Sequence, residues 1–293
     1  MATDFSAPGN RPLKTVISAS RRTDLVASFP EWFASALCER QAGVIGPMGE
    51  VQNVDLSPET VHTIILWSKD FSNLLQNKHG LRDLLAVYDQ LYLHFTVTGL
   101  GGTSAEPGVL PYREALAQLP GLAAVAGDPL RISVRFDPVL FWEEDGETHS
   151  NFTLFSEVAE AAAAQGIRDI RMSFAQWYGK AVRRAAARRF HFSVPSEAEQ
   201  RSRALELAAI AASHGLVLHA CSQPLLSGVP GIRPSACIDG ALLEALHPRG
   251  EHVSRRKDHG QRAACLCTES KDIGSYTQAC PHGCVYCYAN PSI

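Results

Sequence analysis

Five of the eight cysteines lie in the last 29 of the 293 residues, where even scattering would place about one. Three of them, Cys280, Cys284 and Cys287, follow the spacing C-x3-C-x2-C on a segment that also contains glycine and proline. Thiolates converging from one short loop can bind three irons of a four-iron cluster, which leaves one iron without a cysteine. A substrate or cofactor can bind to that open iron. The spacing therefore predicts an iron–sulfur site in the tail.

Structural zinc is the alternative, and it requires four ligands in a closed tetrahedron. Two further tail cysteines, Cys265 and Cys267, could complete such a set with Cys280 and Cys284, and His282 could replace one of them. Neither Cys-x-Cys nor C-x3-C matches the paired C-x2-C knuckles that are usual in zinc sites. The spacing therefore favours iron–sulfur over zinc.

Cys221 and Cys237 raise the question of a second metal site. Together with Cys265 and Cys267 they would supply four thiolates, enough for a closed auxiliary cluster. Free cysteines also pack as small buried hydrophobic residues, so both interpretations stay open for Cys221 and Cys237. Cys38 lies in a predicted amphipathic helix, and we expect it to be a core residue.

Between about residues 14 and 247, short apolar and β-branched runs alternate with helical patterns, which is typical of βα units around a parallel sheet. The runs are continuously apolar, as buried parallel strands should be. Helix starts are indicated by Pro30, by Pro58 and by a capping box of Ser196 with Glu199, whose helix should reach His214. The predicted strands are 15–20, 43–46, 63–68, 92–98, 131–136, 169–173 and 216–221.

Seven strands with helical crossovers predict an α/β fold, a (β/α) barrel that is complete or incomplete, with a doubly wound open sheet as the competing topology. Beyond His247 a charged stretch leads into the cysteine-rich tail. We expect a single domain over 1–293, with the barrel in 14–247. The cysteine-rich cluster-binding tail, 248–293, should fold over the barrel mouth.

Polar residues cluster just after the predicted strands, at the carboxyl ends where parallel sheets bind ligands. Arg21, Arg22 and Asp24 follow the first strand. Paired guanidinium groups suit a carboxylate or phosphate, so these residues are candidates for cofactor binding. A structural salt-bridge network is the alternative interpretation.

Later strands are followed by further candidates. Lys69 and Asp137 could transfer protons or orient a substrate, and we predict catalytic roles for them. Arg135 could bind a cofactor or pair with Asp137. Gly101 belongs to a glycine-rich segment that could let the backbone approach a cofactor, with a flexible loop as the alternative.

The three-cysteine motif, with Tyr286 before its last cysteine and Tyr288 after it, resembles the cluster loop of radical S-adenosylmethionine enzymes, especially spore photoproduct lyase-like proteins. That resemblance implies a [4Fe-4S] cluster on Cys280, Cys284 and Cys287, with S-adenosylmethionine on the fourth iron. Reductive cleavage of this cofactor would give a 5′-deoxyadenosyl radical that takes hydrogen from a substrate. In those enzymes the motif follows the first strand, so here the tail must fold back over the carboxyl face.

A wider set of segments is similar to the DUF1848 family, and this resemblance spans nearly the whole chain. The segments are 17–24, 67–69, 135–138, 237–239 and 272–276.

Composition limits the partners. The 27 lysines and arginines against 30 acidic residues give a net charge of −3, which argues against nucleic acid. The start is polar and no apolar run reaches membrane-spanning length, so we expect a cytoplasmic protein without a membrane partner. The expected partners are a small-molecule cofactor, a substrate of unknown identity and an electron donor such as flavodoxin or ferredoxin. Alternative functions are an iron–sulfur redox or Lewis-acid enzyme without S-adenosylmethionine, and a zinc-stabilised binding protein without catalysis.

Overall fold

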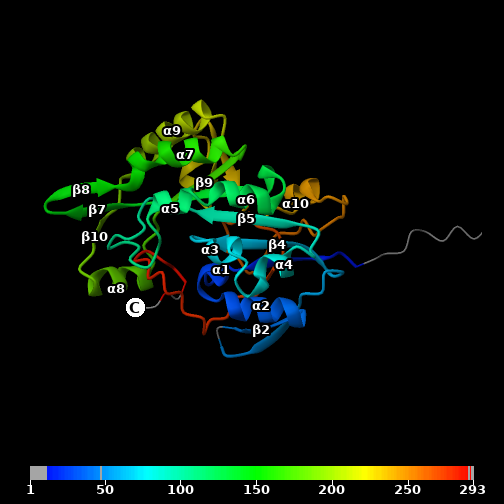
Figure 1. Ribbon diagram of the computed structural model, residues 1–293. Helices are drawn as coiled ribbons and strands as arrows, with labels where there is room; N and C mark the ends of the chain where they lie inside the picture. Colours follow the sequence, from blue (N-terminus) through cyan, green and yellow to red (C-terminus); the bar gives the residue numbers. More distant parts are fainter. Residues whose placement is uncertain (1–11, 47, 290, 292–293) are drawn as a thin grey trace, which may run out of the picture.

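The structure is a computed structural model that describes residues 12–46, 48–289 and 291. An eight-stranded sheet lies at its centre, with helices packed against it (Figure 1). The strand order is β12-β11-β9-β6-β5-β4-β1-β13, and neighbouring strands pair in parallel. In chain order the strands of this sheet are β1 (Thr15–Ala19), β4 (Val61–Ser68), β5 (Leu91–Thr96), β6 (Ile132–Val139), β9 (Asp169–Phe174), β11 (Val217–Cys221), β12 (Ile232–Ser235) and β13 (Lys271–Asp272).

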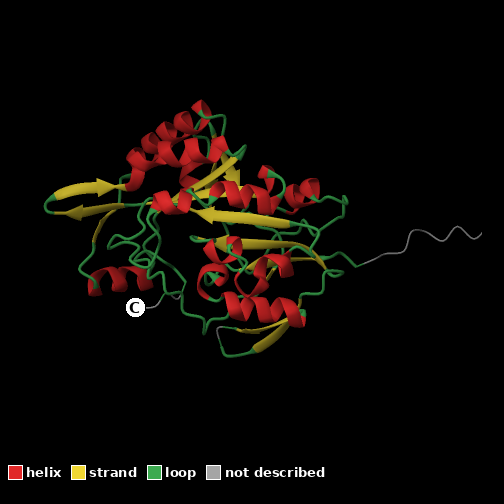
Figure 2. Cartoon of the chain, viewed as in Figure 1, coloured by secondary structure: helices red, strands yellow, loops and turns green. Residues whose placement is uncertain are grey.

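Helices connect most of these strands, and the C-terminal segment consists largely of loop (Figure 2). The capping box of Ser196 with Glu199 is confirmed, and it begins the longest of the described helices. The helices are α1 (Leu25–Ser28), α2 (Pro30–Glu39), α3 (Ser72–Leu75), α4 (Leu81–Leu85), α5 (Tyr112–Leu116), α6 (Leu119–Ala126), α7 (Phe155–Ala164), α8 (Gly179–Ala187), α9 (Glu197–Ser213) and α10 (Gly240–Leu246), with 3-10 turns at Lys78–Gly80, Pro129–Arg131, Asn151–Leu154 and Pro224–Leu226.

The two faces of the sheet are covered by different parts of the chain. Successive strand residues point to opposite faces. Leu93 and Phe95 of β5 pack into the main apolar core, together with residues of α1 to α7 and α9. Tyr92, which precedes Leu93 and points to the opposite face, joins a second cluster with residues of the C-terminal segment, such as Ile238. We call this second side the inner face, and it carries buried polar groups such as Arg171.

The predicted (β/α) barrel is wrong, because the central sheet is open. Its edges are β12 and β13, and within the described residues no strand pairing joins them. β13 pairs with β1 through two residues only, and much of the chain between β12 and β13 packs on the inner face instead of adding strands. From β1 to β12 each strand lies beside the preceding strand of this sheet. Most of the described helices, α1 to α7 and α9, pack on one face, so a doubly wound sheet does not describe the fold either.

Three local predictions also need correction. Residues 43–46 belong to an antiparallel hairpin of β2 (Gln41–Ile45) with β3 (Val51–Asp55), where alternate exposure replaces the continuous burial of a central strand. Pro58 lies in a single turn, because β4 begins at Val61. Cys38 is exposed on α2, whose buried side is formed by other residues. A separate three-stranded sheet, which the sequence did not predict, consists of β7 (Phe141–Glu144), β8 (Glu147–Ser150) and β10 (His191–Ser193).

Among the described helices, none combines the length and the apolar composition that a membrane crossing would need.

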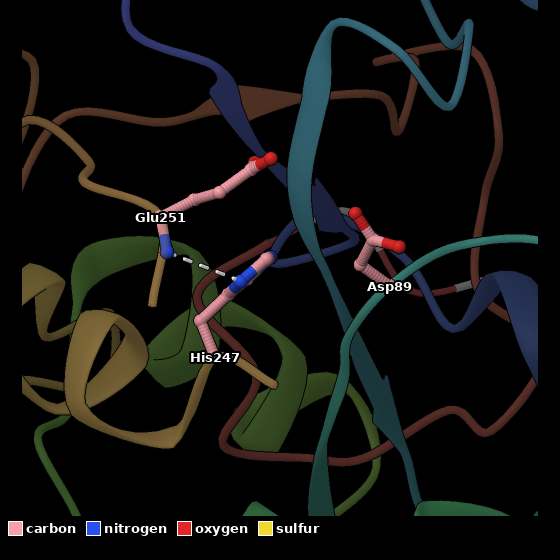
Figure 3. A group of neighbouring side chains, drawn as sticks. All are labelled: Asp89, His247 and Glu251. Carbon is pink, nitrogen blue, oxygen red and sulfur yellow. Dashed lines mark hydrogen bonds between the residues drawn. The ribbon is translucent and has the colours of Figure 1, made fainter. Parts of the chain in front are cut away.

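A charged cluster lies at the amino ends of the strands, where Asp89, His247 and Glu251 come together (Figure 3). Lys14 forms ion pairs with both carboxylates, at 2.6 Å from Glu251 and 3.4 Å from Asp89. His247 Nδ1 accepts backbone N–H groups from Arg249 and Glu251, so the neutral ring carries its proton on Nε2. Both ring nitrogens are therefore unsuited to metal binding, and the Lys14 ammonium already compensates the carboxylates. The cluster is structural.

The same end of the sheet makes stability dependent on pH. Burial lowers the pKa of His62 and of His247, and their rings lie tilted against each other with centroids 4.3 Å apart. In the unfolded chain both should titrate near pH 6.5, so the unfolded state binds more protons as the pH falls below 7. We predict a loss of unfolding free energy of up to about 1.4 kcal/mol per pH unit for each histidine.

His62→Gln should make this pH dependence shallower between pH 7 and 5.5, as measured by urea denaturation. His191→Gln, at an exposed position, is the matched control and should leave the slope unchanged. An equal slope in the wild type and His62→Gln would contradict the assignment.

Candidate metal centre

A cavity of about 270 Å³ lies at the carboxyl ends of the central strands. The strand ends contribute residues such as Ser68, Thr96 and Ser173, and the tail contributes the three-cysteine loop. The C-terminal segment therefore lies against the carboxyl ends of the strands. All eight cysteines are in the described part of the chain and all are free thiols. The cavity is lined by every one of them except Cys38.

The loop that carries Cys280, Cys284 and Cys287 is attached to residues 105–108. The Val285 N–H donates to the Ala105 carbonyl at 2.9 Å, and the Gly108 N–H donates to the His282 carbonyl at 3.1 Å. This attachment fixes the loop beside the glycine-rich segment. Gly101 itself is not among the cavity residues; the position of a Cβ there is taken by the Leu110 carbonyl. Residues 105–108 thus hold the cysteine loop through their backbone, and the predicted contact of Gly101 with a cofactor lies outside this cavity.

Two arginines of α8 hold the same loop. Arg184 Nη1 donates to the Val285 carbonyl at 3.0 Å and to the Cys287 carbonyl at 2.9 Å, and Arg188 donates to the Gly283 carbonyl. Sequence reasoning missed this role, because helical arginines with ordinary spacing give no sign that they bind carbonyls about 100 residues away. The guanidinium of Arg184 also places positive charge near Cys287.

Glu106 is a fully buried carboxylate beneath the loop, and it was not among the predicted site residues. Its Oε1 accepts from Lys69 Nζ at 2.9 Å, from Thr98 Oγ1 at 2.7 Å and from the Tyr286 hydroxyl. Burial lowers the pKa of Lys69, but the neighbouring Glu106 carboxylate outweighs it and holds that pKa above its ordinary value. Lys69 is therefore a fixed positive charge, and of the two roles predicted for it, orienting a substrate suits such a charge better than transferring protons.

Asp24 is the buried carboxylate that pairs with His282, as Glu106 pairs with Lys69. Its carboxylate accepts from Ser68 Oγ at 2.8 Å and from the Lys69 backbone N–H at 2.9 Å. His282 donates from Nε2 to Asp24 at 2.9 Å and from Nδ1 to the Gly108 carbonyl at 3.0 Å. Burial lowers the pKa of His282, but the Asp24 hydrogen bond raises it above its ordinary value. Because both ring nitrogens are donors, His282 has no lone pair for a metal.

Arg21 and Arg22 are engaged with the tail through Asp272. The Asp272 carboxylate lies 3.6 Å from Arg21 Nε and 3.9 Å from Arg22 Nε, and Arg21 also lies 3.4 Å from Asp258. Both arginines line the cavity. The salt-bridge network that the sequence left open is therefore present, and it joins β1 to the C-terminal segment.

Asp137 and Arg135 form an ion pair at the end of β6. Ser173 Oγ donates to the same carboxylate, and Arg135 Nη1 donates to Cys237 Sγ at 3.2 Å. The nearby Cys237 and Asp137 hold the pKa of Arg135 well above its ordinary value, although burial lowers it. Both residues line the cavity. This pair connects the predicted ligand end of the sheet to the second group of cysteines.

That second group contains Cys221, Cys237, Cys265 and Cys267. The sulfurs of Cys221 and Cys237 are 3.2 Å apart, and Cys267 shares hydrogen bonds with both Cys237 and Cys265. These hydrogen bonds lower the pKa of Cys237 well below its ordinary value and lower that of Cys265 to about 6. In the loop, by contrast, burial raises the pKa of Cys280 to about 11 and that of Cys284 well above its ordinary value.

The spacing of the sulfurs tests the zinc alternative. Four thiolates at about 2.3 Å from one zinc ion lie about 3.8 Å from one another. Within the described residues, the only group of three or more His, Cys, Asp or Glu side chains whose ligand atoms all lie within 4.8 Å is the structural cluster of Asp89. The mixed set of tail cysteines that zinc would need is therefore not brought together, and His282 is committed to hydrogen bonds.

The fold and site define an open-sheet α/β protein with a cysteine-lined candidate metal centre at the carboxyl ends of its strands. Residues 16–289 match the model of a protein family that is described as "Domain of unknown function (DUF1848)". The chain belongs to this family, which confirms the resemblance noted from its segments. No curated protein sequence matches the chain. The resemblance to radical S-adenosylmethionine enzymes stays a prediction.

The close approach at Gly108 can be tested. A Cβ at this position would lie 2.5 Å from the Pro281 carbonyl oxygen, so Gly108→Ala must displace the cysteine loop. We predict destabilisation by about 1–3 kcal/mol and several-fold faster iodoacetamide labelling of the buried Cys284 in metal-free protein. Gly43→Ala is the control, because its Cβ meets nothing nearer than 3.8 Å. Unchanged protection of Cys284 would show that the loop does not depend on this contact.

The Lys69–Glu106 pair allows a second test. Glu106→Gln leaves a largely buried ammonium without its counter-charge, and we predict a loss of about 3–5 kcal/mol in unfolding free energy. Lys69→Met combined with Glu106→Gln should recover part of this loss, because no unpaired charge remains. Chemical denaturation of the single and double variants gives the coupling free energy between Lys69 and Glu106. Strictly additive effects would contradict a direct pair.

Proposed function

We propose that this protein is an iron–sulfur enzyme that performs radical S-adenosylmethionine-type chemistry on a substrate bound in the cavity. Cys280, Cys284 and Cys287 would bind a [4Fe-4S] cluster. One observation supports this most strongly: three thiols spaced C-x3-C-x2-C line one cavity at the carboxyl ends of parallel strands, and the nearby His282 cannot supply a fourth ligand.

The chain around these thiols suits a negatively charged cluster. Thiolate ligands carry negative charge, and positive groups beside them offset it. Lys69 lies near Cys284, and Arg184 lies near Cys287. The hydrogen bonds of α8 to the loop carbonyls fix the backbone between the cysteines. These contacts support the proposal because they hold in place the loop that carries the three cysteines, and a cluster bound by three cysteines would leave one iron open to a small molecule.

Bound at that position, S-adenosylmethionine would supply a 5′-deoxyadenosyl radical on reduction by an external electron donor such as flavodoxin or ferredoxin. The chain's own residues would bind and orient the reactants. Arg21, Arg22 and Arg135 give the cavity positive groups suited to a carboxylate. Asp137, held by Arg135 and Ser173, presents a fixed carboxylate that can orient a substrate or accept a proton.

Electron paramagnetic resonance of anaerobically reconstituted, dithionite-reduced protein tests the proposal. We expect a [4Fe-4S]⁺ signal whose g-values shift when S-adenosylmethionine is added. Cys284→Ala should lose the sensitive signal while circular dichroism shows an intact fold. Cys38→Ala, which removes an exposed thiol outside the cavity, is the matched control and should behave as wild type.

The outcomes separate the proposal from its alternatives. An iron signal that ignores S-adenosylmethionine would overturn the radical chemistry and favour a redox or Lewis-acid enzyme. Stoichiometric zinc without iron would overturn both the radical chemistry and the redox or Lewis-acid alternative. A sensitive signal that survives Cys284→Ala would show that other residues hold the cluster.

A further inference from the structure

Four thiols outside the three-cysteine loop come together from separate parts of the chain. Cys221 ends β11, Cys237 follows β12, and Cys265 and Cys267 come from the segment that crosses the inner face. Their contacts run in series from Cys221 to Cys237, from Cys237 to Cys267, and from Cys267 to Cys265. The fold thus collects four sulfurs that lie up to 46 positions apart in the sequence.

The surroundings of these sulfurs differ from those of cysteines that pack only as hydrophobic residues. Each thiol has another thiol as a partner, and two nitrogen donors point at the group. Arg135 Nη1 donates to Cys237 Sγ at 3.2 Å, and the Ile238 backbone N–H donates to Cys267 Sγ at 3.3 Å. Hydrogen bonds of this kind surround thiolates that bind metal and help to set the potential of the centre.

The arrangement also indicates the kind of metal centre. A single tetrahedral ion would require every pair of sulfurs to lie about 3.8 Å apart. No three of these four sulfurs lie mutually within 4.8 Å among the described residues, so they form an extended chain and not a compact tetrahedron. A centre with several metal ions fits such a spread, and four cysteines are the usual ligand set of [2Fe-2S] and [4Fe-4S] clusters.

We propose that Cys221, Cys237, Cys265 and Cys267 bind a second iron–sulfur cluster, closed by four protein thiolates. All four line the same cavity as the loop cysteines. With every iron ligated by the protein, this cluster has no position for S-adenosylmethionine. The proposal stands independently of the proposed function, because it depends on a different set of ligands.

The full-length chain with Cys280, Cys284 and Cys287 all changed to alanine tests the proposal. After anaerobic iron and sulfide reconstitution, this variant should retain about one third to one half of the wild-type iron, with matching sulfide, since two of six or four of eight irons would remain. Its signal should not respond to S-adenosylmethionine. Retained zinc, absence of iron, or a Cys221–Cys237 disulfide found by mass spectrometry would each overturn the proposal.

The reciprocal variant, Cys237→Ser with Cys267→Ser, should lose the iron of the second cluster and keep the S-adenosylmethionine-sensitive signal. Adding the two serines to the triple alanine variant should remove the remaining iron, and full iron retention there would overturn the ligand assignment. Cys38→Ala again serves as the control. Failure of the proposed function would remove the sensitive signal from the wild type, whereas failure of the second cluster would remove iron from the triple alanine variant.

Discussion

The buried carboxylate of Asp272 determines where the C-terminal segment lies. It accepts hydrogen bonds from Ser18 Oγ at 2.8 Å, from Ser20 Oγ at 2.7 Å and from the Arg21 backbone N–H at 2.8 Å. A buried carboxylate is tolerated only with such partners. The short strand β13, which contains Asp272, therefore has one favourable position beside β1. Everything that follows it in the chain, including the three-cysteine loop, starts from that point at the carboxyl end of β1.

Coverage of the inner face follows from the same constraint. Alternate strand residues place Arg171 and Arg135 on this face, where guanidinium groups must find acceptors or remain exposed. Arg171 donates to Ser235 Oγ at 2.9 Å and to the Tyr92 hydroxyl at 3.3 Å. The C-terminal segment supplies the apolar cover through Ile238 and neighbouring residues. The inner face carries both apolar residues and buried guanidinium groups, and this segment covers both, which explains why the cysteines lie inside the fold.

Local signals in the sequence predicted the individual helices and strands better than they predicted whether the sheet closes into a barrel. Runs such as 63–68 are continuously apolar, and the capping box at Ser196 acts within four residues, so both could be read directly. Whether the sheet closes depends on contacts between distant segments, and β13 is too short to produce a periodic pattern. The same limit applies to the site. The cysteine spacing identified the loop, but Glu106 and Arg184 bind it from far away in the sequence, and a single acidic or basic residue carries no local signal of such a contact.

The position of β13 divides the cysteines of the tail into two groups. Cys265 and Cys267 precede the strand, and Cys280, Cys284 and Cys287 follow it. The chain before the strand packs on the inner face, where Cys221 and Cys237 meet it, whereas the chain after it reaches α8 and residues 105–108. Because β13 fixes the point between them, the two groups reach the same cavity with different partners. Thiols of one group sit beside other thiols, and those of the other group sit beside Lys69, Asp24 and Arg184, so one cavity presents two chemically different sets of thiols.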